Sequence, residues 1–196
     1  MPEDLASGVR RFQRDVFPAK AELFRRLATG QAPDALYIGC SDSRVVPELV
    51  TQREPGELFV IRTAGNLVPV HTPYGDGVAA SIEYAVVQLG VTDVVVCGHS
   101  ACGAMSALAE GADLSAMPAV AEWLRYADAA VVETADVAPS ERTAALIRAN
   151  VLLQLSHLAK YACVAEAMDR GALTLHGWVF DIGTGAVEGL TPVAGA

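Results

Sequence analysis

The sequence predicts a single α/β domain in which helices flank a mainly parallel central sheet. The segments with strand character are continuous apolar runs rather than alternating ones, and helical patterns separate them along the chain. Continuous apolar strands are typical of a sheet that is covered on both faces, as parallel sheets are. With 196 residues, of which 52% are hydrophobic, the chain can bury one core of good size, so we expect one domain overall.

We expect residues 1–30 to form a helical arm ahead of a zinc-binding α/β catalytic domain at 31–196. Apolar residues around Phe12 recur at helical spacing, and a second apolar stripe follows around Phe24. Pro18 stands between the stripes and is expected to interrupt the helix. A basic amphipathic segment can bind a membrane surface, but the proline and the lack of a continuous cationic face favour packing on its own domain or on a partner subunit.

Glycine and proline mark the boundaries of the other predicted elements. Gly90 ends one helical pattern, and the segment 66–77, rich in Pro and Gly, reads as a loop. The final strand pattern is followed by a turn at 181–185. The predicted strands cover 35–39, 58–61, 94–97 and 173–180, and the predicted helices cover 45–52, 77–89, 101–109, 120–130 and a long segment from Pro139 to Gly171.

Composition excludes several classes of partner. A formal net charge of −9 and a pI near 4.8 argue against nucleic acid, because binding to its phosphates needs clustered Lys and Arg. The chain shows neither a basic leader nor an apolar run of about 18 residues, so we expect no export signal and no membrane span. We therefore expect a cytoplasmic protein whose four cysteines are reduced. Cys97 and Cys163 are interpreted as small core residues.

Two loops carry residue types that bind a soft metal ion. Cys40 follows the first predicted strand, and His99 and Cys102 follow the third. In an open α/β sheet, ligands bind beyond the carboxyl ends of the strands, so neighbouring strands would bring the two loops together. Two thiolates and one imidazole indicate a catalytic zinc site with the fourth position left for water, because structural sites usually close that position with another side chain. A helix start at Cys102 would also favour its thiolate form.

A carboxylate and a guanidinium lie within four residues of Cys40. Asp42 and Arg44 on a solvated loop could be an ion pair of little energetic value. Beside a metal, the Arg would keep the carboxylate ionised and fix its orientation. Asp42 could then accept a hydrogen bond from zinc-bound hydroxide, or it could become the fourth zinc ligand and shut the site.

At these residues the sequence resembles a β-class carbonic anhydrase. The motifs that carry the resemblance are CSDSR at 40–44 and HSACG at 99–103, and two further segments resemble the family, PGELFVIR at 55–62 and SIEYA at 81–85. The resemblance covers roughly residues 5 to 190. Thr63 is a departure, because the family usually has Asn after this Arg, and it puts the hydrogen bonding at the end of the second strand in doubt.

The resemblance implies a dimer-based α/β fold, in which the N-terminal arm embraces the partner and the active site lies near the subunit interface. We expect a homodimer or a multiple of dimers. Zinc would be bound by Cys40, His99 and Cys102, and Asp42 with Arg44 would form the catalytic dyad. The substrate-pocket positions, some contributed across the dimer, would be Gln31, Phe59, Tyr84 and Gly103.

The implied activity is the reversible hydration of CO2 to bicarbonate and a proton by zinc-bound hydroxide, since zinc lowers the pKa of bound water to about 7. Two other functions remain open. The same site could hydrolyse carbonyl sulfide or carbon disulfide, which are linear and apolar like CO2. Alternatively, it could be a non-catalytic zinc or thiol-sensing module, although such a module has no use for an oriented carboxylate such as Asp42.

Some members of the family have a second, inhibitory bicarbonate pocket built from a Trp, an Arg and a Tyr, and its occupation moves the dyad Asp onto zinc. Here Arg62 matches the Arg, but Tyr37 stands at the Trp position and Phe180 at the Tyr position. Phe180 has no hydroxyl to donate to the anion, which weakens the pocket. We therefore expect the plant-like, open-site subgroup, with Asp42 paired to Arg44.

Overall fold

The computed structural model describes residues 4–72 and 75–190. The chain divides into two compact units, residues 1–32 and 33–196, and each is described by itself. Within the described ranges, no helix is long and apolar enough to cross a membrane.

The N-terminal unit is helical almost throughout. It consists of α1 (Leu5–Arg11), a π-helical turn (Phe12–Val16) and α2 (Phe17–Leu27). The predicted interruption at Pro18 is wrong, because this residue lies in the first turn of α2, where a missing N–H costs no hydrogen bond. Just before it, the Phe17 N–H bonds to the Phe12 carbonyl five residues back, and this wider turn accommodates the proline.

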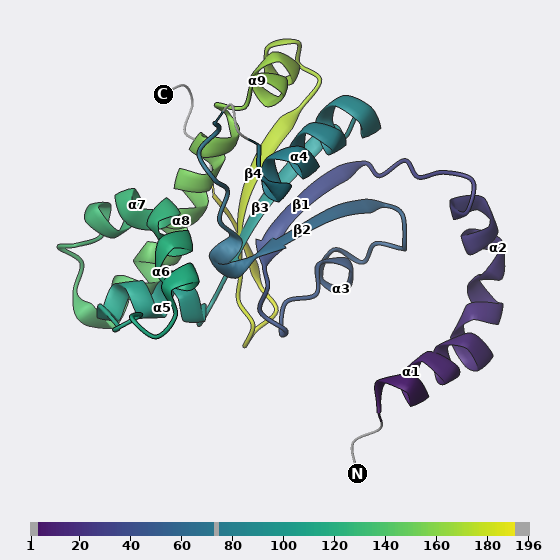
Figure 1. Cartoon of the computed structure of the whole chain (residues 1–196), viewed down its shortest axis with the longest axis horizontal. Coiled ribbons are helices and arrows are strands. Elements are labelled where there is room, and N and C mark those ends of the chain that lie inside the picture. Colours follow the sequence, from purple (N-terminus) through teal and green to yellow (C-terminus); the bar gives the residue numbers. More distant parts are fainter. Residues whose placement is uncertain (1–3, 73–74, 191–196) are drawn as a thin grey trace. The chain divides into compact units, whose positions relative to one another are not determined.

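One five-stranded sheet forms the centre of the second unit, in the order β2-β1-β3-β4-β5 (Figure 1). The strands are β1 (Ala35–Cys40), β2 (Leu58–Thr63), β3 (Asp93–His99), β4 (Thr174–Phe180) and β5 (Val187–Leu190). The first four run parallel, which confirms the predicted mainly parallel sheet. The sequence analysis missed β5, which pairs antiparallel to β4, because this short, exposed strand contains no apolar run.

In the second unit, helices lie in the connections between β1 and β2, between β2 and β3, and between β3 and β4. They are α3 (Pro47–Thr51), α4 (Gly77–Glu83) with a π-helical turn (Tyr84–Leu89), α5 (Gly103–Glu110), α6 (Pro118–Leu124), a 3₁₀ turn (Arg125–Ala127), α7 (Asp128–Glu133), α8 (Pro139–Leu158) and α9 (Ala162–Asp169). The helix predicted at 120–130 is thus two helices joined by a 3₁₀ turn. A further 3₁₀ turn, Ala64–Asn66, follows β2.

The long helix predicted between Pro139 and Gly171 is also two helices. It breaks at Tyr161, whose backbone is extended with ψ of 125°. The Tyr161 side chain is buried, and its hydroxyl donates to the Pro69 carbonyl at 2.9 Å. This tertiary hydrogen bond is not visible in the helical periodicity, which continues across the break.

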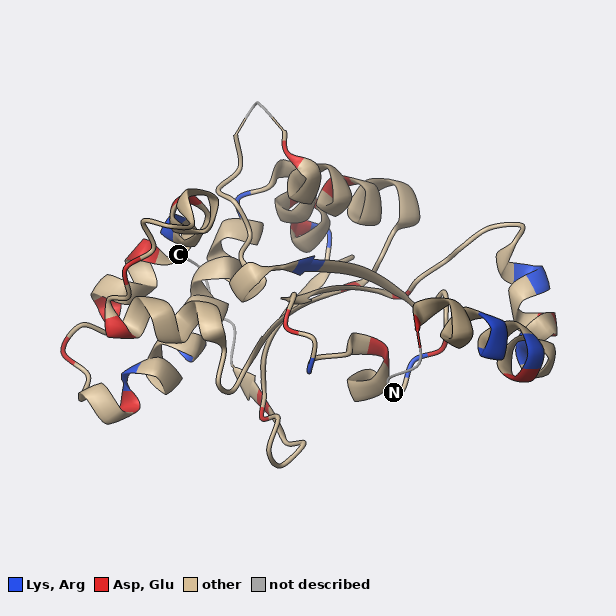
Figure 2. Ribbon diagram, turned by 60° about the horizontal axis from the view of Figure 1, so that its bottom comes forward, with Lys and Arg blue, Asp and Glu red and all other residues tan. Residues whose placement is uncertain are grey.

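The main apolar core lies between the sheet and α4, α8 and α9. It is formed by buried residues such as Leu36 and Val94 from the strands and Ile82, Val151 and Val164 from the three helices. A second core joins α5, α6 and α7 to α8. Charged residues lie mostly on the helices and loops rather than on the strands (Figure 2).

Helix α8 approaches the sheet closely at Gly98 of β3. A Cβ atom at this position would lie 2.9 Å from Val151 Cγ2 and 3.2 Å from Ile147 Cγ2, so only glycine allows this separation. The close approach brings the buried polar face of α8 to the level of the 64–68 turn. This face holds Asn150, Gln154 and His157.

Candidate metal centre

The structure brings Cys40, His99 and Cys102 together. One ligand atom from each residue lies within 4.8 Å of the other two, and all three side chains are buried. Strands β1 and β3 are neighbours, with Gly39 opposite Cys97, so Cys40 and His99 end the two strands at the same edge of the sheet. The predicted meeting of the two loops is confirmed.

Cys102 reaches the cluster through a tight turn. Ala101 has a left-handed backbone with φ of +53°, and Cys102 follows as the N-cap of α5. Its side chain forms no capping hydrogen bond, so the sulfur lies at the N-terminus of α5 without being used as a cap.

His99 is held in a form that can bind a metal. Its Nδ1 lies 3.0 Å from the Ser100 carbonyl, so Nδ1 carries the proton and Nε2 carries the free lone pair. His99 is fully buried, and Nε2 has no hydrogen-bond partner in the described part of the chain. A buried nitrogen without a partner is costly unless something else, such as a metal ion, occupies its lone pair.

The two cysteine sulfurs affect each other's ionisation. The neighbouring Cys102 thiol is the main cause that lowers the pKa of Cys40, to about 4. The same contact with Cys40, together with burial, raises the pKa of Cys102. Two sulfurs and one imidazole are a donor set that fits zinc.

Asp42 and Arg44 form a planar, two-point ion pair beside the cluster. Arg44 Nε donates to Asp42 Oδ1 at 2.9 Å, and Arg44 Nη2 donates to Oδ2 at 2.7 Å. These bonds hold the pKa of Asp42 well below its usual range. Asp42 Oδ2 also lies 3.9 Å from His99 Nε2, so it faces the point where the ligand atoms converge. Arg44 Nη2 reaches the Ala101 carbonyl at 3.0 Å and thereby links the two loops.

Comparison with known proteins agrees with this geometry. Residues 35–187 match the family model described as carbonic anhydrase. The chain belongs to the β-class carbonic anhydrase family. It is 58% identical over 190 residues to a carbonic anhydrase of Pseudomonas aeruginosa strain PAO1. The alignment covers 95% of this chain and 86% of the relative.

Two solved structures show the same fold. The β-carbonic anhydrase CcaA superposes with a TM-score of 0.91 at 38% identity, over 95% of this chain and 93% of that one. A structure from a study of two tetrameric β-carbonic anhydrases of the filamentous ascomycete Sordaria macrospora gives a TM-score of 0.78 at 32% identity, over 95% and 91% of the two chains.

Arg62 has a role in this carbonic anhydrase chain that the sequence analysis missed. Its Nε donates to the Cys40 carbonyl at 3.0 Å, and its Nη2 donates to the Asp42 carbonyl at 2.5 Å. The Arg62 side chain therefore fixes the backbone at both Cys40 and Asp42. A single arginine in an otherwise apolar strand was the available signal.

The residues at the other two positions of the inhibitory pocket that some family members have lie in one cluster. Tyr37 is fully buried, and Phe180 packs against the same cluster on the sheet. The Tyr37 hydroxyl has no hydrogen-bond partner in the described residues. The doubt raised by Thr63 is also resolved, because its hydroxyl donates to the Leu67 carbonyl at 2.9 Å and its carbonyl accepts the Ser41 N–H.

The expected substrate-pocket residues do not all gather at the cluster within one chain. Phe59 and Tyr84 lie together, with ring centroids 5.9 Å apart. Phe59 pairs with Leu36, four residues before Cys40 along β1, which is roughly 13 Å along a strand. Gly103 begins α5 directly after Cys102, whereas Gln31 belongs to the N-terminal unit.

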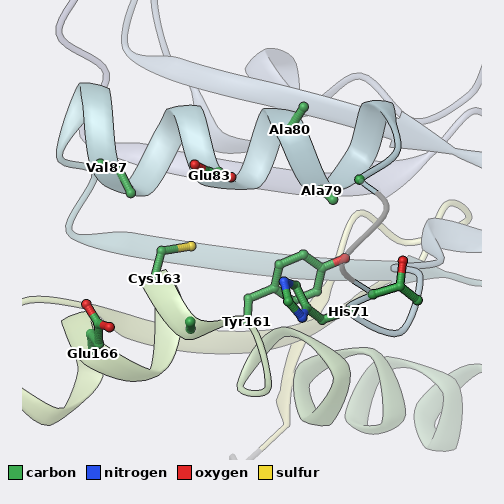
Figure 3. Close-up of a pocket in the computed structure, with 11 residues that line it drawn as sticks. His71, Ala79, Ala80, Glu83, Val87, Tyr161, Cys163 and Glu166 are labelled. Atoms are coloured by element: carbon green, nitrogen blue, oxygen red, sulfur yellow. The ribbon is translucent and has the colours of Figure 1, made fainter.

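A pocket of about 440 Å³ lies elsewhere, between α4 and α9 (Figure 3). The His71 ring stands edge-on to Tyr161 there, with centroids 5.0 Å apart, and Glu83 and Glu166 line the wall. The residues that line this pocket in the described part of the chain include none of the metal cluster or the dyad. The pocket is therefore separate from the candidate metal centre.

The Arg44 fork predicts the effect of a conservative substitution. Arg44→Lys keeps the charge but loses at least one of the two bonds to Asp42, each worth about 1.5 kcal/mol or more. We expect kcat/KM for CO2 hydration, measured by stopped flow, to fall by about tenfold or more while the metal content is unchanged. Arg125→Lys is the control, because Arg125 pairs with Glu122 on the surface. Equal activity of Arg44→Lys and the parent would contradict the importance of the fork.

Proposed function

We propose that this chain catalyses the zinc-dependent, reversible hydration of CO2 to bicarbonate and a proton. The observation that carries the proposal is the buried cluster of Cys40, His99 and Cys102, with an imidazole nitrogen that has no other partner. Thiolate and imidazole ligands favour zinc over hard cations such as magnesium or calcium. Three protein ligands, rather than four, are typical of a catalytic zinc site.

Each residue of the site has a distinct task in this proposal. Cys40, His99 and Cys102 would hold zinc, which when bound supplies a water with a pKa of about 7 as the nucleophile. Asp42 stays ionised because of Arg44, so its Oδ2 can accept a hydrogen bond from that nucleophile but cannot donate one. This one-way hydrogen bond would orient the nucleophile towards carbon. Arg44 and Arg62 would position Asp42 without touching the substrate.

Carbonyl sulfide and carbon disulfide are the alternative substrates of the same site, since both are linear and apolar like CO2. A non-catalytic zinc or thiol-sensing module is less well supported, because Asp42 is oriented towards the cluster by three hydrogen bonds from Arg44. A comparison of CO2 hydration with carbonyl sulfide hydrolysis, on protein of measured zinc content, separates these functions. Slow CO2 hydration beside fast carbonyl sulfide hydrolysis would overturn the proposal.

We predict one zinc per chain, and its loss when a thiolate ligand is removed. Cys40→Ala and Cys102→Ala should each abolish zinc retention and CO2 hydration, as measured by elemental analysis and stopped flow. Cys163→Ala is the control, because Cys163 lies in α9 and lines the separate pocket. Stoichiometric zinc in either the Cys40 or the Cys102 variant would contradict the ligand assignment.

We also propose a dimer or a multiple of dimers in the cytoplasm. Phe59 and Tyr84 lie far along the sheet from Cys40 of their own chain, so as substrate-pocket residues they would have to serve a partner's site. The Sordaria macrospora relatives are tetrameric, which supports such an assembly. A reducing cytoplasm would suit the four cysteines, all of which are free.

Light scattering tests the assembly. We expect a mass of at least two chains that persists on dilution to the concentration of the activity assay. Tyr84→Ala should then lower kcat/KM for CO2 without lowering the zinc content, because Tyr84 lies outside the metal cluster of its own chain. A stable monomer with full activity would contradict the dimer-based assembly.

We further propose that the site stays open at neutral pH, as in the plant-like subgroup. The Arg62 guanidinium already donates to two backbone carbonyls, and Phe180 offers no hydroxyl to an anion. The pairing of Asp42 with Arg44 also supports an open site. Bicarbonate titration of the hydration rate near pH 7.5 should therefore give simple, weak product inhibition. Sigmoidal inhibition by bicarbonate would show that the inhibitory switch operates in this chain.

A further inference from the structure

Ser100 follows His99 in the chain, and its backbone carbonyl holds the histidine ring. The imidazole Nδ1 of His99 donates to this carbonyl at 3.0 Å. The hydrogen-bond partner of a metal-binding histidine sets which ring nitrogen is free and how the ring is oriented. The position of the Ser100 carbonyl therefore decides how His99 presents Nε2 to the metal cluster.

Two hydrogen bonds tie Ser100 to the end of β4 and the turn that follows it. The Ser100 N–H donates to the Phe180 carbonyl at 2.9 Å, directly after the pairing of His99 with Phe180. The Ser100 hydroxyl accepts the Ile182 N–H at 2.9 Å. Any residue except proline could form the first bond, whereas the second needs a side-chain acceptor. Ser100 is half-buried, and its hydroxyl is used for this contact with the turn.

The turn that carries Ile182 is closed by hydrogen bonds of its own. The Asp181 N–H donates to the Ala186 carbonyl and the Gly185 N–H donates to the Asp181 carbonyl, both at 2.8 Å. Asp181 Oδ1 accepts the Thr184 N–H at 2.7 Å. Gly185 has a φ of +75°, which glycine adopts without strain. The Ile182 N–H is therefore presented to Ser100 by a turn with a defined backbone.

Strand β5 attaches the far end of this turn to the rest of the domain. It pairs antiparallel with β4, with Val187 opposite Phe180. Glu188 of β5 also forms an ion pair with Arg148 of α8, with Arg148 Nη2 and Glu188 Oε2 2.7 Å apart. Both ends of the turn are thus connected to larger elements, although β5 itself is short and exposed.

We propose that Ser100 is a positioning residue for the metal centre, through which the β4–β5 turn holds the imidazole of His99. Ser100 is not one of the three cluster residues, and it would act on the ring only through its carbonyl. Without its hydroxyl, Ser100 would keep the backbone bond to Phe180 and lose the bond to Ile182, so its carbonyl would be held less firmly. This inference rests on the proposed metal-dependent function and adds a residue to the support of its metal site.

Ser100→Ala is the direct test, because it removes the hydroxyl and keeps the backbone bonds. Ser100→Thr is the rescue variant, since it retains the oxygen, and Ser100 lines a pocket of about 250 Å³ that offers space for the added methyl group. Ser156→Ala is the matched control, because this half-buried serine of α8 bonds through its hydroxyl to the Leu153 carbonyl at 2.7 Å. The measurements are the zinc dissociation constant from chelator competition and the solvent exchange of the His99 Nδ1 proton, followed by NMR of the cobalt-substituted protein.

We expect Ser100→Ala to raise the zinc dissociation constant by about tenfold, at the low end for the loss of a partner of a metal ligand, because the carbonyl itself remains. The His99 Nδ1 proton should exchange faster. Ser100→Thr should restore both values, and Ser156→Ala should change neither. Unchanged affinity and exchange in Ser100→Ala would overturn the inference, and so would a Ser100→Thr variant as impaired as Ser100→Ala. A parent protein that binds no zinc would instead contradict the proposed function itself.

Thr184→Ala takes the place of Ser100→Ala if that variant does not fold. Thr184 Oγ1 donates to Asp181 Oδ1 at 2.8 Å, so the substitution loosens the turn that presents Ile182 and leaves Ser100 unchanged. The His99 Nδ1 proton should again exchange faster than in the parent. An exchange rate equal to that of the parent would overturn the inference.

Discussion

The parallel pairing of β1 with β3 is the constraint on which the rest of the site depends. In the sheet order β2-β1-β3-β4-β5, the chain runs from β1 outward to β2 and then returns to the other side of β1. Connections diverge at such a reversal and leave a crevice at the carboxyl ends of the strands. Cys40 and His99 end these two strands, so the pairing brings a thiol and an imidazole to the same end of the sheet.

Backbone atoms held by distant side chains complete the site. Arg62 fixes the carbonyls of Cys40 and Asp42, and Arg44 joins Asp42 to the loop that leads to Cys102. The 64–69 segment is fixed in the same way by side chains from α6, α8 and the start of α9. The cost of burying these polar groups is offset because nearly every one has a partner. The hydrogen bonds therefore fix the backbone around the cluster, and such a preformed site favours metal binding because little ordering remains to be done.

The sequence was sufficient to predict the four parallel strands and the meeting of Cys40 with His99 and Cys102, because continuous apolar strands and closely spaced Cys and His are local signals. It was insufficient where a tertiary contact decides the structure. The break at Tyr161 depends on a hydrogen bond to Pro69, and the role of Arg62 depends on carbonyls about twenty residues away. The hydrogen bonds of Trp123 and Asn150 to the carbonyls of Ala64 and Gly65 gave no signal either, since an isolated Trp or Asn in a helix has many possible partners. The strand β5 is too short and exposed to show a pattern.

X-ray absorption at the zinc edge of the loaded protein tests the central claim most directly. The account predicts that zinc has two sulfur neighbours at about 2.3 Å and nitrogen or oxygen neighbours at about 2.0–2.1 Å. The sulfurs would be those of Cys40 and Cys102, and one nitrogen would be His99 Nε2. A spectrum without sulfur, or with a third or fourth sulfur neighbour, would contradict the assignment of Cys40, His99 and Cys102 as an open zinc site.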